Sequence, residues 1–314
     1  MRIFRDHNDI PADARGASAA IGNFDGVHLG HRSVLDLARR DDTPLAVVTF
    51  EPHPREVFAP DAPPFRLMSP AARANRLAKL GVDLLFELPF DTIAPLTAEA
   101  FMSDVLANGL GLTHVVTGAD FKFGKGRAGD VGVLRSGGAR LGFDVSVAAL
   151  LGDTSPVSST AIRTALTDGR PRDAAAMLGH WHRIEGPVLH GEKRGRELGY
   201  PTANMGLDGL HLPKLGVYAV LVDVLEGPDA GTYHGVASLG VRPMFGENTP
   251  NIETFLFDFE GDLYGKQISV ALIDFLRPEM TFDGLPGLIA QMDGDSARAR
   301  DILTALPDPV PVHG

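Results

Sequence analysis

The sequence contains no cysteine. Disulfide bonds, thiolate catalysis and cysteine-ligated zinc or iron–sulfur centres are therefore excluded. Nothing in the chain requires an oxidising compartment, and its first eleven residues lack the apolar core of a secretion signal. These absences favour a cytoplasmic protein.

Long apolar runs and an excess of positive charge are missing as well. No stretch approaches the ~18 consecutive apolar residues that a membrane-spanning helix needs. The 29 Lys and Arg residues are outnumbered by 40 Asp and Glu residues, which gives a formal net charge of −11. A dedicated binder of nucleic acid or of anionic membranes needs a broad basic surface, so neither partner is expected. Small anionic substrates remain compatible with this charge, because a local cradle and a metal ion suffice to hold a nucleotide.

The composition is that of an ordinary globular protein, in a chain long enough for two domains. Hydrophobic residues make up 44% and charged residues 22% of the 314 positions, and a typical domain has about 150 residues. In the first half, short apolar runs alternate with helical patterns, which predicts a doubly wound parallel α/β sheet over residues 1–182. The expected strands are residues 17–22, 45–50, 83–88, 114–118 and 144–150, and the expected helices are 30–40, 69–80, 97–110, 131–141 and 161–166.

The second half, residues 183–314, has a different pattern of expected secondary structure. Short β-rich runs are separated by Gly and Pro turns, and a single helical pattern closes the chain. This order predicts a small antiparallel β-barrel with a C-terminal helix. The expected strands are residues 184–190, 217–225, 233–239, 252–259 and 268–276, followed by a helix over 285–306.

The strongest local motif is residues 22–31, which follow the first expected strand and read Gly-Asn-Phe-Asp-Gly-Val-His-Leu-Gly-His. In an open α/β sheet, ligands bind where a strand's carboxyl end leads into a helix, and the helix N-terminus favours phosphate. His28 and His31 are three residues apart, so both rings project to one side of a first helical turn. Two imidazoles and backbone donors can hold the triphosphate of ATP and stabilise charge developing at its α-phosphorus. Candidate phosphate-binding residues here are Gly22, Phe24, Asp25 and Gly30, the last because glycine lets a ligand approach the backbone closely.

Two other interpretations of these histidines stay open. In one, the first histidine caps the helix and the second is a surface residue. In the other, the pair ligates zinc, although the motif offers no third ligand. A dinucleotide fingerprint is excluded, because Gly-x-Gly-x-x-Gly is absent from the segment.

The segment resembles the His-x-Gly-His signature of nucleotidyltransferases, which class I aminoacyl-tRNA synthetases share with small adenylyl- and cytidylyltransferases. That superfamily places a basic, Ser/Thr-rich segment near the end of its nucleotide-binding fold, and residues 158–163 look like it. The hydroxyls of Ser158, Ser159 and Thr160 at a helix start, with Arg163 on the first turn, would form a second phosphate clamp. Taken alone, the same residues read as a plain N-cap with a solvated arginine.

Two further loops follow expected strands and would share the same crevice. Residues 49–54 contain two prolines, which stiffen the loop around His53. Residues 118–124 contain Asp120, Phe121 and Phe123, and these aromatics are able to line a flat ring system. Both segments could also be ordinary loops.

A glycine-rich, basic stretch opens the second half at residues 191–204. Backbone N–H groups and cations in such a loop can hold phosphates, with Gly191, Lys193, Arg194 and Gly199 as candidates. Thr202 and Asn204 alternate with Ala203, so in an extended segment both face one way, where their oxygens can serve a magnesium ion. It is not a Walker A loop, and the alternative is a basic surface turn that leads into a strand.

Residues 251–259 supply a carboxylate among aromatic side chains. Alternation places Glu253 on one strand face with Phe255, Phe257 and Phe259. A carboxylate in such surroundings suits a general base toward a hydroxyl. The alternative is a glutamate on an edge strand that pairs with an arginine such as Arg242.

Together these motifs closely resemble the family of bifunctional prokaryotic riboflavin kinase/FMN adenylyltransferases (FAD synthetases), over nearly the whole chain. Residues 195–204 look like the flavokinase signature, and residues 240–246 and 275–280 also resemble the family. Two positions depart from its pattern: Met244, where threonine is frequent, and Ala161, where arginine is common. The departure at Ala161 removes one possible phosphate contact and leaves Arg163.

The resemblance implies a Rossmann-like nucleotidyltransferase domain followed by a riboflavin kinase barrel, with Mg²⁺ as cofactor. In the barrel, riboflavin and ATP would give FMN, with Glu253 as base and with Thr202 and Asn204 organising the magnesium nucleotide. In the first domain, FMN and a second ATP would give FAD and pyrophosphate, with His28, His31 and Arg163 as catalytic residues. Flavin-binding candidates are His53, Asp120, Phe121, Phe123 and Arg277.

Two rival hypotheses remain. One is a different nucleotidyltransferase fused to a barrel, against which the segments around Asn204 and Glu253 argue. The other is a non-catalytic flavin or nucleotide sensor, against which the acidic charge and the apparently complete set of catalytic candidates argue. The partners expected are small molecules, and the motifs make no prediction of oligomeric state.

Overall fold

The computed structural model describes residues 1–149, 157–190, 199–242 and 249–306. By their internal contacts the described residues form two compact units. Of the described residues, the first unit contains those within Met1–Ala62 and Arg73–Val157, and the second contains Pro63–Ala72 and those from Ser158 to Leu306. The helices α7 (Ser159–Thr167) and α8 (Pro171–Leu178) thus group with the second unit, although the sequence interpretation assigns them to residues 1–182. The division at residues 182 and 183 stays a prediction.

A six-stranded parallel sheet forms the centre of the first unit, as the alternating pattern predicts. Its strand order is β1-β4-β3-β2-β5-β6. The central strands are buried on both faces, which is why they read as continuous apolar runs in the sequence. The strands are β1 (Arg2–Phe4), β2 (Ser18–Ile21), β3 (Leu45–Glu51), β4 (Leu84–Pro89), β5 (His114–Gly118) and β6 (Asp144–Ala148).

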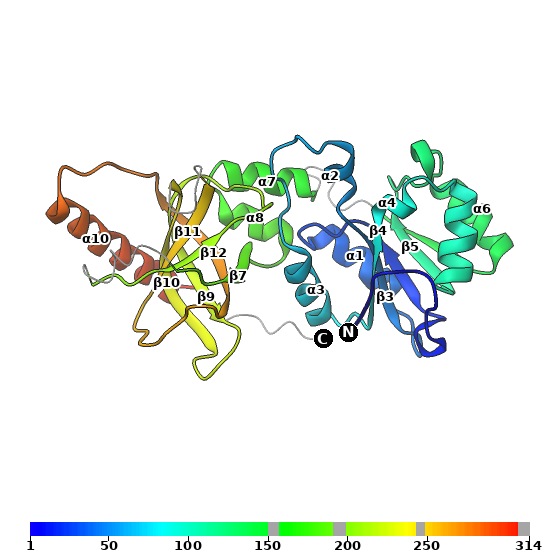
Figure 1. The fold of residues 1–314 in the computed structure, drawn as a ribbon, viewed down its shortest axis with the longest axis horizontal. Coiled ribbons are helices and arrows are strands. Elements are labelled where there is room, and N and C mark those ends of the chain that lie inside the picture. Colours follow the sequence, from blue (N-terminus) through cyan, green and yellow to red (C-terminus); the bar gives the residue numbers. More distant parts are fainter. Residues whose placement is uncertain (150–156, 191–198, 243–248, 307–314) are drawn as a thin grey trace. The chain divides into compact units, whose positions relative to one another are not determined.

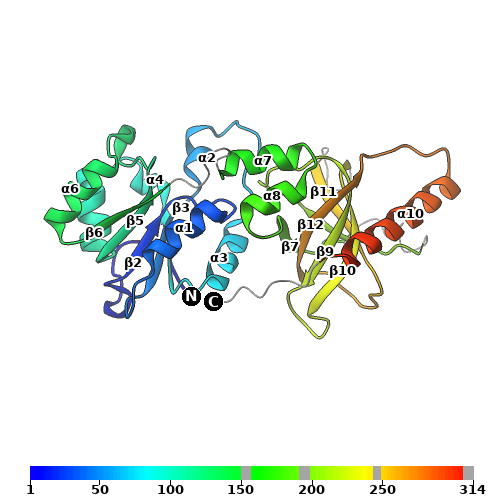
Figure 2. The ribbon, with the colours of Figure 1, turned by 180° about the vertical axis from the view of Figure 1, so that it is seen from behind.

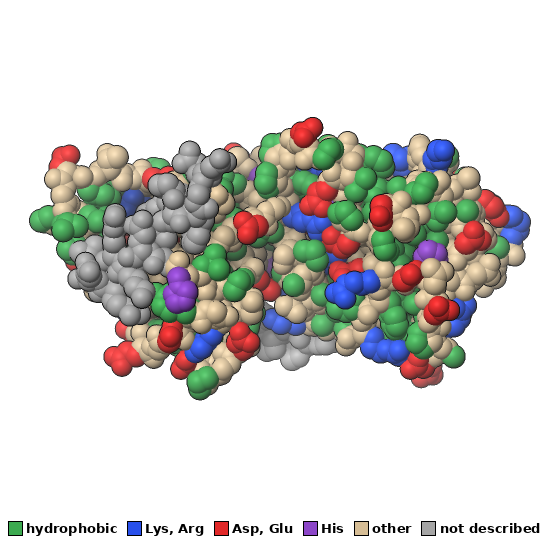
Figure 3. Space-filling model, viewed as in Figure 1, with side chains coloured by type: hydrophobic (Ala, Val, Ile, Leu, Met, Phe, Trp, Pro, Cys, Tyr) green, Lys and Arg blue, Asp and Glu red, His purple; other side chains and the backbone are tan. Residues whose placement is uncertain are grey.

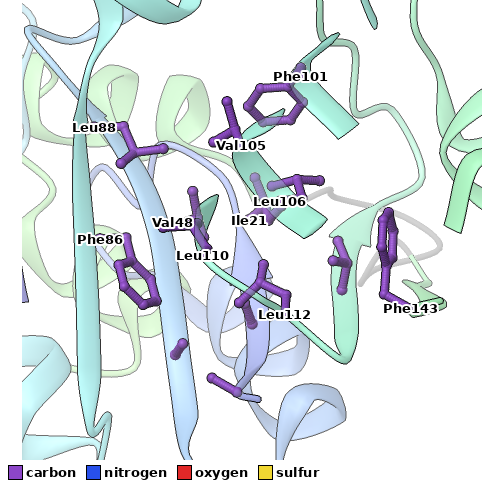
Figure 4. Close-up of a cluster of buried hydrophobic side chains, with 14 of the residues drawn as sticks. Ile21, Val48, Phe86, Leu88, Phe101, Val105, Leu106, Leu110, Leu112 and Phe143 are labelled. Carbon is purple, nitrogen blue, oxygen red and sulfur yellow. The ribbon is translucent and has the colours of Figure 1, made fainter. Parts of the chain in front are cut away.

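Helices cover both faces of this sheet. The helix α1 (Leu29–Ala38) packs on one side against β2, β3, β5 and β6, whereas α6 (Val131–Leu141) lies on the other (Figures 1 and 2). Between the sheet and α6, strand residues such as Val48 and Phe86 pack with Phe101 and Leu106 (Figure 4). The remaining short elements are η1 (Ala12–Ala14), α2 (Pro54–Phe58), α3 (Pro70–Lys79), α4 (Phe90–Ile93), α5 (Ala98–Ala100) and η3 (Lys125–Arg127).

Three details of residues 1–182 differ from the expectation. The helix expected over residues 97–110 consists of α5 and a nine-residue π-helix, η2 (Phe101–Gly109). The edge strand β1 was not expected, because its three residues are partly exposed and carry no apolar run. The helix α8 was likewise not expected, although Pro171 stands at its first turn.

The second unit contains a six-stranded antiparallel sheet that curls into a nearly closed barrel, as predicted. Its strand order is β7-β12-β9-β10-β11-β8, and a bridge between Leu189 and Asn204 joins the two ends. Alternate residues fill the interior, with Val220, Ile252 and Leu272 among those that are fully buried. The strands are β7 (Arg183–Pro187), β8 (Ala203–Gly206), β9 (Gly216–Val224), β10 (Gly231–Arg242), β11 (Thr249–Leu256) and β12 (Gln267–Arg277).

The C-terminal helix α10 (Leu285–Thr304) packs on the outside of the barrel, across β9, β10 and β12. Its buried Ala299 and Leu303 belong to an apolar cluster with Phe257. An ion pair between Arg277 at the end of β12 and Asp295 of α10, 2.8 Å apart, anchors the helix. The sequence predicts both this helix and its place after the last strand.

On the face seen in Figure 3, basic side chains lie scattered among acidic ones. None of the helices in the described part of the chain combines the length and the apolar character that crossing a bilayer requires.

Candidate active sites

The loop with the two histidines leaves the sheet of the first unit where the strand order reverses. The chain proceeds from β2 to β3 and β4 on one side, and then places β5 and β6 on the other side of β2. Ligands of open α/β sheets bind outside the carboxyl ends of the strands at such a switch point. The loops after β2 and β5 therefore flank the place where the fold favours a ligand.

His28 is the N-cap residue of α1. Its Nδ1 accepts a hydrogen bond from the backbone N–H of His31, at 3.3 Å. In the neutral ring the proton therefore lies on Nε2, which makes that atom a hydrogen-bond donor. The sequence left open whether a histidine caps this helix, and the structure shows that His28 does. The cap fixes the orientation of His28, which is 7% exposed.

His31 stacks on His28, with ring centroids 3.7 Å apart and an interplanar angle of 16°. The fully buried ring of Phe24 packs against its other side, at 4.9 Å. Burial, and secondarily the neighbouring His28, hold the pKa of His31 well below its usual value. His31 is therefore a neutral imidazole at pH 7. Its ring N–H, like the Nε2–H of His28, can act on phosphate oxygens as a hydrogen-bond donor.

Gly30 has a structural role besides the expected one. A Cβ atom at this position would lie 3.1 Å from both Cε1 and Nδ1 of His28. The glycine therefore makes room for the capping imidazole, in addition to any ligand.

We expect Gly30→Ala to lower the rate of adenylyl transfer from ATP to FMN about tenfold, because a displacement of a few tenths of an ångström misaligns the His28 ring. Thermal unfolding should show no loss of stability, since alanine favours a helix by up to about 1 kcal/mol over glycine. Gly287→Ala in α10 is the matched control, because nothing lies within 4 Å of its added Cβ. An unchanged rate in Gly30→Ala would contradict this role.

The remaining candidates of the first motif are also placed by this loop. Asp25 is 5% exposed, and Gly22 lies directly after β2. Phe24 and Val27 have positive φ angles of 52° and 42°, a region that side chains other than glycine rarely adopt. The loop thus holds an unusual backbone directly before the histidines.

The Ser/Thr-rich segment lies in the second unit. Ser158 caps α7 by accepting a hydrogen bond from the N–H of Ala161 at 3.2 Å, while Ser159 and Thr160 begin the helix. The Nε of Arg163 donates to the carbonyl of Phe65 at 2.6 Å, and its guanidinium lies over the Phe65 ring. Since these residues belong to a different unit from His28 and His31, their joint action on one nucleotide stays a prediction.

Three of the four flavin candidates of the first unit have structural roles. His53 caps α2, with its Nδ1 accepting from the N–H of Arg55 at 3.1 Å. Phe123 is 7% exposed within the core, and the half-buried Phe121 stacks on it at 5.5 Å. Asp120 is exposed in the loop after β5. Flavin binding by these residues stays a prediction.

A second polar site lies on the barrel. In the antiparallel register, Glu253 of β11 stands directly opposite Asn204 of β8 on one side and Ser238 of β10 on the other. Directly opposed residues project to the same face of a sheet, so these three side chains form one row. The neighbours Ala203 and Thr254 are also opposite each other, and they face the barrel interior.

Two buried oxygens in or beside this row have no partner among the described residues. Asn204 Oδ1 and Asn251 Oδ1 are buried and accept no hydrogen bond from any described residue. The Nδ2 of Asn251 lies 3.5 Å from Glu253 Oε1. Buried acceptors are normally satisfied, so two orphaned ones beside a carboxylate favour a missing cation or donor. Asn251 was not singled out from the sequence, although its position two residues before Glu253 puts it on the same face.

Thr202 and Asn204 both line a pocket that Phe259 and Tyr264 also border. That the two polar side chains serve one ligand stays a prediction. Gly199 has a φ of 80°, which suits glycine. Gly191, Lys193 and Arg194 lie outside the described residues, as does Met244.

The expected surroundings of Glu253 need correction at one residue. Phe255 and Phe257 do pack in the cluster beneath α10, but Phe259 packs against Tyr233 with the barrel core. The alternation ends because β11 stops at Leu256 and Asp258 has a φ of 56°. Arg277, the flavin candidate of this unit, forms an ion pair with Asp295 through its Nε and Nη2 atoms.

Comparison with known proteins gives the two activities that the sequence motifs suggest, in the same order along the chain. A family model described as FAD synthetase matches residues 10–161, and one described as riboflavin kinase matches residues 178–303. These matches cover both halves of the chain.

Similar proteins match the chain almost from end to end. A Pseudomonas fluorescens protein named bifunctional riboflavin kinase/FMN adenylyltransferase is 40% identical over 307 residues, covering 96% of this chain and 97% of its own. A Bacillus subtilis protein of the same name is 35% identical over 309 residues, covering 95% and 96%. A crystal structure described as a macrolide-efflux protein from Streptococcus pneumoniae is 30% identical, with a TM-score of 0.82 over 96% of this chain and 98% of that one. The chain belongs to the family of bifunctional riboflavin kinase/FMN adenylyltransferases and makes FMN and then FAD.

Proposed function

We propose that Glu253 is the general base of the kinase reaction. The ribityl 5′-hydroxyl of riboflavin attacks the γ-phosphorus of ATP, its proton passes to the Glu253 carboxylate, and ADP leaves as the Pγ–O bond breaks. The observation that carries this assignment is the row in which Glu253 stands directly opposite Asn204, beside two buried amide oxygens that no described residue satisfies. The proposal extends to Gly191, Lys193, Arg194 and Gly199 as phosphate contacts and to Arg277 as a flavin contact.

The donor set around Asn204 fits a magnesium ion. Its buried Oδ1 has no partner among the described residues, and the Thr202 hydroxyl lines the same pocket. Amide and hydroxyl oxygens are ligands that hard divalent cations accept. Magnesium held there supplies neutralisation of the phosphate charge of ATP. In this proposal Thr202 and Asn204 orient the nucleotide, and Glu253 moves the proton.

For adenylyl transfer, we assign the principal role to the stacked histidines. A phosphate oxygen of FMN attacks the α-phosphorus of ATP, and pyrophosphate leaves as the α–β phosphoanhydride bond breaks. The nucleophile is already deprotonated, so positioning and charge stabilisation suffice. His28 and His31 contribute N–H donors, and Arg163 contributes the cation. The phosphate contacts proposed beside them are Gly22, Phe24, Asp25, Gly30, Ser158, Ser159 and Thr160, and the flavin contacts are His53, Asp120, Phe121 and Phe123.

Each of the two reactions is assigned to one half of the chain. We assign adenylyl transfer to residues 1–182 and the kinase reaction to residues 183–314, which the ranges of the two family matches support. A cytoplasmic location is part of the proposal, in agreement with a chain that contains no cysteine.

The metal assignment is tested with Asn204→Ala. We expect the Mg²⁺ concentration for half-maximal riboflavin phosphorylation to rise about tenfold or more, because one oxygen ligand is lost. The assay follows FMN formation from riboflavin and ATP by chromatography while Mg²⁺ is titrated. Conversion of supplied FMN to FAD by the same preparation is the internal control and should keep its Mg²⁺ dependence. An unchanged Mg²⁺ dependence of the kinase would refute the role of Asn204.

A further inference from the structure

A buried arginine outside the histidine motif contacts the start of that motif. Arg73 lies in α3 and its side chain is 3% exposed. Its Nη1 donates to the backbone carbonyl of Asn23 at 3.3 Å. Its Nη2 lies 2.6 Å from Glu51 Oε1 and 2.9 Å from Glu87 Oε1. One guanidinium thus joins the loop after β2 to the ends of β3 and β4.

The arrangement is costly for a purely structural element. Arg73 and Glu87 are nearly inaccessible, at 3% and 6%, and Glu51 is 23% exposed. Removing such charges from water costs several kcal/mol per ion, and a well-packed apolar group of similar volume is often at least as stabilising. A planar guanidinium, however, can bind carboxylates and a carbonyl in fixed directions, which an apolar group cannot do.

The carbonyl that Arg73 holds has a second buried donor. The hydroxyl of Thr49, which is fully buried, donates to the same Asn23 oxygen at 3.2 Å. The side chain of Asn23 is itself exposed, so the loop is held here through its backbone.

The residues after Asn23 need such support. Phe24 and Val27 have φ angles of 52° and 42°. Conformations of this kind are strained and persist only where the surroundings impose them. The next residues are His28, which caps α1, and then His31, which stacks on it. The position of the imidazole pair therefore depends on how the loop is held at its beginning.

We propose that Arg73 is a positioning residue for adenylyl transfer: with Thr49, it fixes the Asn23 carbonyl and thereby the strained loop that presents His28 and His31. The inference rests on the role proposed above for the two histidines. Arg73 acts through the loop, and Glu51 and Glu87 hold its guanidinium in the required orientation.

Arg73→Lys is the first test. Lysine keeps the positive charge beside the two carboxylates, but a single ammonium group lacks the fork that also reaches Asn23. We expect kcat for FAD formation from FMN to fall about 10- to 100-fold, with KM for ATP and FMN changed less than about threefold, because the catalytic groups and not the substrates are displaced. Riboflavin phosphorylation by the same protein should be unchanged. Arg140→Lys is the matched control, since Arg140 pairs with Glu99 on the surface of the same unit.

Thr49→Val provides a second measurement that does not depend on Arg73→Lys folding. Valine has nearly the same shape and removes only the hydroxyl that contacts Asn23. We expect kcat for adenylyl transfer to fall about five- to tenfold at unchanged KM. If both variants fold, as judged by thermal unfolding, and keep the wild-type kcat, the inference is wrong. If Arg73→Lys does not fold, a wild-type kcat in Thr49→Val alone overturns it.

A His31→Ala background separates this inference from the proposed function. If Arg73 acts through the histidines, Arg73→Lys should lower kcat much less in that background than in the wild-type chain. An equal fold-change in both backgrounds would mean that Arg73 acts by another route. If His31→Ala itself retains full activity, the proposed role of the histidines fails, whatever Arg73 does.

Discussion

Replacing Glu253 by glutamine should reduce FMN formation from riboflavin by about 10²–10⁴-fold, the usual contribution of a general base. Glutamine has nearly the size of glutamate and keeps an oxygen that can accept from Asn251 Nδ2, but it cannot take the proton of the attacking hydroxyl. The row that Glu253 forms with Asn204 and Ser238 should persist, because the β8–β11–β10 register is made by the backbone. The loss should therefore be one of chemistry, with folding unchanged.

The measurement uses two substrates on one preparation. With riboflavin and ATP, chromatography should show almost no FMN, whereas supplied FMN should still become FAD at the wild-type rate. Glu260→Gln is the matched control, because it makes the same change in charge at an exposed position four residues past β11. A kinase rate within about threefold of wild type in Glu253→Gln would exclude general-base catalysis by this carboxylate.

Loss of either imidazole should impair FAD formation and spare riboflavin phosphorylation, which is the opposite of the effect expected for Glu253→Gln. We expect His28→Ala and His31→Ala each to lower FAD formation from FMN by about 10²–10³-fold, comparable to the loss of one preorganised hydrogen-bond donor. Riboflavin phosphorylation should be unchanged, because the residues assigned to it lie in the other compact unit.

The capping role of His28 requires a separate variant. Removing an N-cap costs about 1 kcal/mol, so His28→Ala lowers helix stability as well as activity. Asparagine is a good N-cap and lacks the imidazole ring, so His28→Asn should keep the melting temperature and still lose adenylyl transfer. His234→Ala, at an exposed position on β10, serves as the control for histidine removal. Loss of both activities in a folded His28→Asn protein would contradict the division between the two sites.

The sequence predicts the architecture well where burial leaves a direct pattern. Strands covered on both faces appear as apolar runs, and β5 has the predicted bounds. The π-helix at Phe101–Gly109 was missed because its apolar spacing also fits an α-helix. The short edge strand β1 has no comparable pattern, since its three residues are partly exposed.

For the candidate sites, the sequence predicted how the polar side chains are spaced along the chain and which of them share a face. The three-residue separation of His28 and His31 correctly placed both rings on one side of a helix start. The lowered pKa of His31 depends on burial of its ring, against which Phe24 packs, and residue spacing does not reveal this burial. The contact of Arg73 could not be predicted from spacing either, because it joins Arg73 to Asn23, 50 positions away in the chain.

Asn204 and Glu253, the residues proposed for the kinase reaction, owe their common orientation to the way β8 and β11 are paired. Side chains of a strand alternate between its two faces, so sliding β8 by a single residue would turn Asn204 inward and Ala203 outward. An insertion or deletion of one residue that shifts this pairing would therefore separate the amide from the carboxylate even if every strand still formed. If Asn204 and Glu253 act as proposed, phosphorylation requires the register in which these two strands pair as much as it requires either side chain.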